Sequence, residues 1–248
     1  MTSTADHKTY AVLFAGGMGS RMNGARIPKQ FLKLGGKPIL AYTIDQFEQH
    51  PEVDGIVVVS LPDWIDYIND LLKLYHFKKV ITVVPGGETG QQSIFNGLTA
   101  LNEAELITDD AVVLIHDGVR PLIDGETISA CIESVREKGP TATVAPAIET
   151  IIRTEDGKVD EIIDRSQCRL ARAPQGFIAA DLWNAHIQAR EQQLSDFIDS
   201  ISLMAHFGYP IYTVNGPAEN IKITTPSDFF AFKGYMDLNE LGQLWEND

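Results

Sequence analysis

The segment 10-YAVLFAGGMGSRMNGARIPKQF-31 joins a short apolar run to a glycine-rich loop that carries an arginine and a lysine. An apolar run followed at once by glycines is typical of a buried strand that ends at a ligand-binding turn. Glycines there let the backbone approach a ligand closely and turn its N–H groups toward an anion. The segment therefore predicts the first strand of an α/β fold and an anion-binding loop at the end of that strand.

The chain then alternates short runs rich in valine and isoleucine with longer amphipathic runs. The short runs predict strands at 10–15, 55–61, 79–84, 111–117 and 142–147. The longer runs predict helices at 38–50, 63–77, 92–104 and 124–139. This order predicts an α/β fold with a mostly parallel, Rossmann-like sheet flanked by helices, in which ligands bind at the carboxyl ends of the strands.

The alternation is interrupted after Ile148, where two β-rich runs flank Asp156-Gly157. An Asp-Gly pair in this position predicts a β-hairpin, and we expect it to project as an arm over 148–172 within a single domain that spans 1–248. The remaining pattern predicts helices near 179–193 and 196–208, a strand at 210–216 and a C-terminal helix from Ser227, capped by the Ser227 hydroxyl.

Composition narrows the class of partner. Lys plus Arg total 20 against 34 Asp plus Glu, so the net charge of −14 argues against nucleic acid as a partner. The two cysteines form no CxxC pair, which fits ordinary thiols in a reducing compartment. No apolar stretch reaches the roughly 18 residues of a membrane span, so we expect a cytoplasmic protein with no membrane partner.

The glycine loop matches neither of two well-known phosphate-binding loops. A dinucleotide-binding loop requires a glycine where Met22 stands, and a P-loop requires Ser or Thr where Pro38 follows Gly36-Lys37. The loop instead carries Arg21 and Lys29, two separated cations that suit a triphosphate. A glycine-rich turn with two solvated cations is the alternative.

The pattern A-G-G-x-G-x-R-M followed by P-K-Q-F resembles the signature of nucleotidyltransferases that move a nucleoside monophosphate onto a phosphorylated sugar or polyol. Within that group the chain is similar to the cytidylyltransferases that act on methylerythritol phosphate and ribitol phosphate. The resemblance extends from Ala11 to about Phe230. Its further motifs, in order, are 86-GG…S-93, 116-HDGVRP-121, 149-ET-150, 164-DR-165, 173-APQGF-177 and 219-ENIKIT-224.

The resemblance implies a set of site residues. Those expected to be catalytic, by neutralising the triphosphate, are Arg21, Lys29 and Lys222. Those expected to bind the nucleotide are Ala15, Gly16, Gly17, Gly19, Gly86, Gly87, Ser93 and Asp117. Those expected to bind the acceptor are Asp117, Arg120, Thr150 and Arg165. We further expect Mg²⁺ as the cofactor with Asp117 as a ligand, while His116 is expected to be structural.

The resemblance also implies a homodimer with shared active sites, because in relatives the arm reaches into a partner subunit and its Thr and Arg contact the acceptor phosphate there. The expected reaction is attack by an acceptor phosphate oxygen on the α-phosphorus of CTP. Rival hypotheses are a nicotinamide reductase, disfavoured by Met22, and an inactive nucleotide sensor, disfavoured by retention of the cations.

Several positions depart from the methylerythritol phosphate enzymes. Those enzymes commonly read His-Asp-Ala-Ala-Arg-Pro, Asp-Thr and Thr-Pro-Gln, where this chain has Gly118-Val119, Glu149 and Ala173. Relatives also usually carry arginine where Gly90 stands. The Gly90 departure concerns the selection of CTP over UTP, whereas the acceptor motifs, with Val119 before the arginine, favour ribitol 5-phosphate as the acceptor, for teichoic acid or capsule synthesis. Methylerythritol 4-phosphate, for isoprenoid synthesis, is the alternative.

Overall fold

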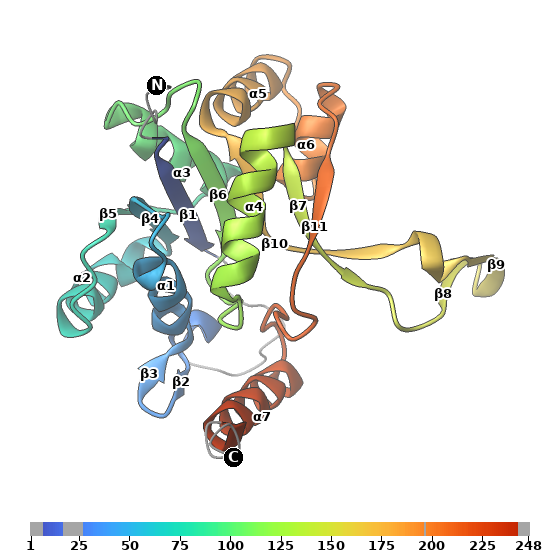
Figure 1. The fold of residues 1–248 in the computed structure, drawn as a ribbon, viewed down its shortest axis with the longest axis horizontal. Helices are drawn as coiled ribbons and strands as arrows, with labels where there is room; N and C mark the ends of the chain where they lie inside the picture. Colours follow the sequence, from blue (N-terminus) through green and yellow to red (C-terminus); the bar gives the residue numbers. More distant parts are fainter. Residues whose placement is uncertain (1–6, 17–26, 196, 243–248) are drawn as a thin grey trace, which may run out of the picture.

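The computed structural model of the chain describes residues 7–16, 27–195 and 197–242, and its centre is a twisted sheet (Figure 1). The strands of this sheet run in the order β11-β7-β10-β6-β1-β4-β5. Their bounds are β1 Thr9–Ala15, β4 Gly55–Ser60, β5 Val80–Pro85, β6 Val112–Asp117, β7 Thr141–Pro146, β10 Arg169–Ile178 and β11 Tyr212–Asn215. Strands β4 and β6 are buried at every position, which explains their unbroken runs of aliphatic residues.

Helices cover both faces of the sheet (Figure 1). The α-helices are α1 Ile39–Gln49, α2 Ile65–Leu74, α3 Gly90–Glu103, α4 Gly125–Lys138, α5 Ala179–Glu191, α6 Ser200–His206 and α7 Pro226–Gly242. Short 3₁₀ turns are η1 Lys29–Phe31, η2 Pro62–Trp64 and η3 Arg165–Gln167. Helices α3 and α4 begin at side-chain caps, where Thr89 and Asp124 accept hydrogen bonds from backbone N–H groups three residues on.

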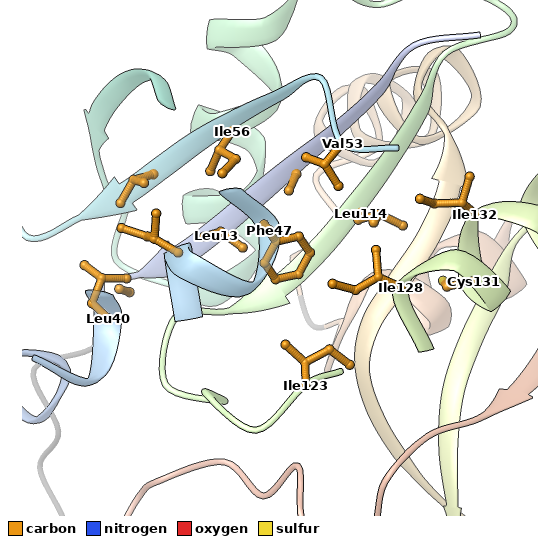
Figure 2. Close-up of a cluster of buried hydrophobic side chains, with 14 of the residues drawn as sticks. Leu13, Leu40, Phe47, Val53, Ile56, Leu114, Ile123, Ile128, Cys131 and Ile132 are labelled. Atoms are coloured by element: carbon orange, nitrogen blue, oxygen red, sulfur yellow. The ribbon is translucent and has the colours of Figure 1, made fainter. Parts of the chain in front are cut away.

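The alternation of side chains along β1 divides the interior into two cores. Leu13 packs with Phe47 of α1 and Ile128 of α4 on one face, and Figure 2 shows such side chains filling the space between the sheet and these helices. Val12 packs on the other face with Leu98 of α3 and with residues of α5 and α6. The two covered faces make this a three-layer α/β fold, which confirms the predicted class.

Strand β10 is the main departure from the predicted topology. It pairs antiparallel with both β6 and β7, while all other pairs in the central sheet are parallel. The sequence interpretation treated Ala173–Phe177 only as a motif and predicted no strand there. The periodicity gave little signal, because Arg169–Arg172 (Arg-Leu-Ala-Arg) does not alternate apolar and polar residues and the following Ala-Pro-Gln-Gly has low strand propensity.

The predicted hairpin forms and projects from the body of the molecule as an arm (Figure 1). Its strands are β8 Ile151–Glu155 and β9 Lys158–Ile163. Asp156 and Gly157 both have positive φ, at 49° and 75°, as a tight hairpin turn requires. The end of the range expected for the arm lies in β10, where Arg169 already pairs with β7.

Near the C-terminus three expectations need correction. Helix α6 begins at Ser200 with Asp199 as its cap, because Asp199 accepts a hydrogen bond from the Ser202 N–H. Helix α7 begins at Pro226, and its cap is Thr225, whose hydroxyl accepts from the Asp228 N–H, not Ser227. The strand predicted at 210–216 is shorter and comprises β11, Tyr212–Asn215.

A small hairpin, β2 Lys33–Leu34 with β3 Lys37–Pro38, precedes α1. Among the described residues, none of the helices combines the length and the apolar character needed to span a bilayer.

Candidate functional site

The glycine loops predicted to bind a nucleotide meet at the carboxyl ends of β1 and β5. A Cβ atom on Gly16 would lie 3.2 Å from the Ser93 Oγ, and one on Gly86 would lie 3.1 Å from the same atom. Both separations are shorter than side-chain contacts ordinarily allow, so the two loops pack with backbone against backbone. This close approach favours glycine at both positions, because a side chain at either one would press on Ser93.

Ser93, in the first turns of α3, orders the second glycine loop. Its hydroxyl accepts a hydrogen bond of 3.1 Å from the Gly87 N–H and donates one of 3.0 Å to the Thr89 carbonyl. The loop therefore has a fixed shape before any ligand arrives. Gly90, where relatives usually carry arginine, borders open space, since a Cβ atom there would meet nothing within 4 Å.

The 3₁₀ turn η1 places Lys29 beside the first glycine loop. Its neighbour Gln30 is buried and donates a 2.6 Å hydrogen bond from Nε2 to the carbonyl of Ala15, at the end of β1. Phe31 stacks on Trp64, with ring centroids 4.4 Å apart. These two contacts fasten the turn to the body of the fold, so that Lys29 lines the cavity at the loop.

Asp117, at the end of β6, joins two cations. Its Oδ2 accepts from the Arg120 Nε at 2.7 Å, and its Oδ1 lies 2.6 Å from the Lys222 Nζ. Burial by itself raises the pKa of Asp117, but Lys222 and Arg120 together outweigh burial and hold that pKa below its usual range. The carboxylate is therefore ionised at neutral pH.

Asn220 fixes the same cluster from the other side. Its backbone carbonyl accepts a 2.9 Å hydrogen bond from the Arg120 Nη1. Its side-chain amide donates one of 2.8 Å to the backbone carbonyl of Ala173 in β10. Both Asn220 and His116 are buried. The His116 Nε2 lies 3.1 Å from the Arg120 carbonyl, and burial lowers the pKa of His116 to about 4, so the neutral ring supports the turn.

Two adjoining cavities open at this edge of the sheet. The first, of about 220 Å³, is lined by predicted nucleotide-binding residues and cations, among them Ala15, Gly16, Lys29, Gly87 and Ser93. The second, of about 340 Å³, is lined among others by Arg120, Arg172, Ala173, Gln175 and Asp199. Phe14, Gly90, Asp117 and Lys222 line both cavities. The Asp117–Lys222 ion pair thus lies at the boundary between two binding spaces.

Other predicted site residues either lie outside the described part of the chain or belong to the arm. Gly17, Gly19 and Arg21 lie outside the described residues. Thr150 and Arg165 are exposed in and beside the arm and line neither cavity, and the Arg165 guanidinium donates to the Ile148 carbonyl. Within one chain, therefore, the structure unites Lys29, Asp117, Arg120 and Lys222 but leaves the residues of the arm apart.

A family profile described as IspD, 2-C-methyl-D-erythritol 4-phosphate cytidylyltransferase, matches residues 9–237. The chain belongs to the IspD family. A Streptococcus agalactiae serotype V protein named ribitol-5-phosphate cytidylyltransferase is 48% identical, with 94% of this chain and 97% of that protein covered. A Clostridium acetobutylicum protein named 2-C-methyl-D-erythritol 4-phosphate cytidylyltransferase is 36% identical, with 93% and 98% covered.

Among solved structures, 4-diphosphocytidyl-2C-methyl-D-erythritol synthase from Anaerococcus prevotii superposes with a TM-score of 0.78 at 28% identity, covering 94% of this chain and 97% of that one. These similarities confirm the fold class, the resemblance drawn from the motifs and the prediction that the chain is a nucleotidyltransferase.

The magnesium ligand expected for this IspD-family chain does not fit the arrangement of Asp117. Each carboxylate oxygen already contacts a cation, so a metal ion there would compete with Lys222 and Arg120 for Asp117. Over the described ranges, no group of three or more His, Cys, Asp or Glu side chains is placed to hold a metal ion. No step of the reaction is therefore assigned to a protein-held metal.

The pair Gly118-Val119, interpreted from the sequence as a signature of the acceptor, does not line the second cavity. A Cβ atom on Gly118 would lie 2.9 Å from side-chain atoms of both Ala15 and Leu40, so the packing in this chain favours glycine here. Val119 lines the first cavity, and its carbonyl accepts from the Ile223 N–H. The direct contacts to an acceptor must come from other residues.

Sequence reasoning missed three polar residues of the IspD site. Gln30 and Asn220 lie inside recognised motifs, within two residues of Lys29 and Lys222, which were assigned to the site. This proximity could have identified them as candidates. Arg172 directly precedes 173-APQGF-177 and was passed over because no strand was predicted there. Its place in the second cavity depends on β10.

Proposed function

We propose that this IspD-family chain transfers CMP from CTP to D-ribitol 5-phosphate, giving CDP-ribitol and pyrophosphate. The observation that carries the proposal is the pair of adjoining cavities that share the Asp117–Lys222 ion pair. One cavity has the glycine loops suited to a nucleotide, and the other has the arginines suited to a second phosphate. The relatives at 48% identity are named for ribitol 5-phosphate, which supports this acceptor, while both names occur among the relatives at 36%.

In the proposed reaction an oxygen of the acceptor phosphate attacks the α-phosphorus of CTP in line with the bond to the β-phosphate. The new P–O bond forms as the α–β bridging bond breaks, and pyrophosphate leaves with the bonding electrons. No general base is needed, because a phosphate monoester with a second pKa near ~6 is largely ionised at neutral pH. The chain supplies positioning and neutralisation of charge.

Lys29 and Lys222 are the described residues that we assign to this neutralisation, with Arg21 as a third cation. Lys222 lies at the boundary of the cavities, where the attacking and leaving groups must meet. Because the chain carries a net charge of −14, the site must gather its cations locally to attract two anions. We propose that Mg²⁺ arrives bound to the phosphates of CTP, as part of the substrate.

We also propose a homodimer in which the arm of one chain completes the acceptor site of the other. Exposed aliphatic side chains are concentrated on the arm and its base, namely Ile148, Ile152, Val159, Ile162 and Leu170. Exposed apolar side chains gathered on a projecting hairpin suit a protein partner. Thr150 and Arg165 would then act on the partner's acceptor.

The test is pyrophosphate release from CTP with Mg²⁺, with ribitol 5-phosphate and methylerythritol 4-phosphate supplied in parallel. We expect turnover with ribitol 5-phosphate, and a kcat/KM for it well above that for methylerythritol 4-phosphate. Turnover with methylerythritol 4-phosphate alone would show that this compound, and not ribitol 5-phosphate, is the acceptor. No pyrophosphate release with either compound would overturn the assignment of these polyol phosphates. The product would serve teichoic acid or capsule synthesis in the cytoplasm.

A further inference from the structure

Strand β10 is irregular where it passes the second cavity. Its pairing with β7 moves from Ala171 opposite Val144 to Gln175 opposite Ala142, so four steps along β10 match two along β7. Extra residues of this kind re-aim side chains and occur next to active sites. Arg172 is the first residue inside the irregularity, and it lines the second cavity together with Arg120.

The guanidinium of Arg172 forms no ion pair with any carboxylate in the described part of the chain. Its Nε is buried and makes no hydrogen bond within the described parts of the chain. Burial, and after it the nearby Arg120, lower the pKa of Arg172, although an arginine keeps its charge at any physiological pH. The two guanidinium groups therefore make the electrostatic potential in the second cavity more positive.

The carboxylates of this cavity are already engaged. Asp117 holds Arg120 and Lys222. Asp199 caps α6 through the Ser202 N–H and accepts a 3.0 Å hydrogen bond from the Gln175 side chain. Neither carboxylate is paired with Arg172, so its charge calls for an anion that enters from outside.

The irregular segment is held firmly. The carbonyl of Pro174 accepts a 2.7 Å hydrogen bond from the Thr143 hydroxyl, and the carbonyl of Ala173 accepts from Asn220. Because the backbone carbonyl of Asn220 also accepts from Arg120, one buried residue links the backbone next to Arg172 to the second guanidinium. The two cations are thus arranged before a ligand binds.

We propose that Arg172 and Arg120 form an anion clamp that binds the phosphate of the acceptor polyol, with Arg172 as a binding residue that the sequence motifs do not mark. A phosphate monoester carries close to two negative charges and offers several oxygens to bidentate guanidiniums. The inference rests on the proposed function and deepens it: recognition of the acceptor depends on the irregularity of β10, not on Gly118-Val119.

The test compares Arg172→Gln and Arg172→Lys with the wild type, and Arg169→Gln is the matched control. Arg169 lies on the same strand but is exposed and donates to local carbonyls. We expect Arg172→Gln to raise the KM for ribitol 5-phosphate by about tenfold or more, since a lost charged hydrogen bond is worth roughly 1.5–3 kcal/mol. The KM for CTP should stay within about twofold for all variants, and Arg172→Lys should be intermediate because it keeps the charge but loses the fork.

Calorimetric titration with ribitol 5-phosphate, inorganic phosphate and uncharged ribitol separates this clamp from the reaction itself. The clamp requires that the wild type bind the two phosphates and not ribitol, and that Arg172→Gln lose this difference. Three results for Arg172→Gln would overturn the clamp. They are an unchanged KM for the acceptor, a parallel rise in the KM values for the acceptor and for CTP, and phosphate binding equal to that of the wild type. If the wild type binds these anions but turns over neither polyol phosphate, the proposed reaction fails while the clamp stands.

Discussion

The Nζ of Lys222 lies 2.6 Å from the Oδ1 of Asp117, and this ion pair joins the segment before α7 to the end of β6. The two partners differ in exposure, because the lysine side chain is 41% exposed and the aspartate side chain 10%. The ammonium group of Lys222 can therefore turn from Asp117 toward an incoming phosphate while it is still in contact with water. Asp117 is held in place and is a structural anchor for two cations.

Replacing Lys222 with methionine should separate activity from stability. An exposed lysine contributes little to folding, so we expect the free energy of unfolding to change by less than about 1 kcal/mol. The kcat should fall by about 100-fold, as when one preorganised charge donor is removed from a transition state. Urea unfolding and pyrophosphate release measure the two effects. A kcat within about twofold of the wild type would remove Lys222 from the mechanism.

Replacing Asp117 with asparagine should instead destabilise the fold. The nearly buried Arg120 would lose its counter-charge, and breaking a buried pair costs about 3 kcal/mol. Asp160→Asn is the control, because Asp160 pairs with Arg153 on the exposed arm and its loss should cost less than about 1 kcal/mol. Equal urea midpoints for the two variants would contradict the anchoring role of Asp117.

Much of the fold was predictable because buried parallel strands and amphipathic helices leave clear periods in the sequence. The run 111-AVVLIHD-117 is one example, and it forms β6 at nearly the predicted bounds. Strand β10 was not predictable in this way. Its identity as a strand comes from pairing with β6 and β7, which are remote in sequence, and local propensity does not report such pairing.

The candidate site was predictable where chemistry follows directly from a strand end. Asp117 and Arg120 come after β6 and were found by that rule, whereas Arg172 needed the register of β10. The roles proposed for Thr150 and Arg165 would require a second chain, which periodicity within one chain cannot describe. Gly118 shows a different limit: the motif associates this position with the acceptor class, whereas its surroundings show that a Cβ atom there would lie close to Ala15 and Leu40.

Gly118→Ala tests that reinterpretation. The added methyl would overlap Ala15 and Leu40, so we expect a loss of about 1–3 kcal/mol in the free energy of unfolding. The ratio of kcat/KM values for the two polyol phosphates should not change. Gly234→Ala, on α7 with nothing within 4 Å of the new methyl, is the control and should be neutral or slightly stabilising. If Gly118→Ala changed the preferred acceptor without a loss of stability, the interpretation of Gly118-Val119 as a signature of the acceptor would be supported instead.

Stability should fall as the pH is lowered from about 7 to about 5.5. Burial lowers the pKa of His116 to about 4, and burial with the neighbouring Arg190 lowers the pKa of His186 to about 4, from 6.5. Because the unfolded chain binds a proton in this window and the folded chain does not, each histidine removes about 1 kcal/mol. His186→Leu should therefore halve the loss of urea stability due to these two groups. His76→Asn, at an exposed position with a positive φ of 57°, should leave the loss unchanged.

The dimer proposal can be tested at the arm without touching either cavity. Ile152 and Ile162 are opposite each other on β8 and β9, and Ile162 is 70% exposed. A charge at Ile162 should leave the fold of one chain intact but prevent an apolar surface from being buried. We expect Ile162→Asp to be monomeric by light scattering, with a raised KM for the acceptor and an unchanged affinity for CTP.

Leu74→Asp is the control for this change, because Leu74 is 67% exposed at the end of α2, away from the arm. It should keep the oligomeric state and both KM values of the wild type. If Ile162→Asp is monomeric yet binds the acceptor normally, Thr150 and Arg165 have no role in a shared site. If it stays dimeric, the arm is not the contact. Both outcomes leave the Arg120–Arg172 clamp intact, because all of its residues belong to one chain.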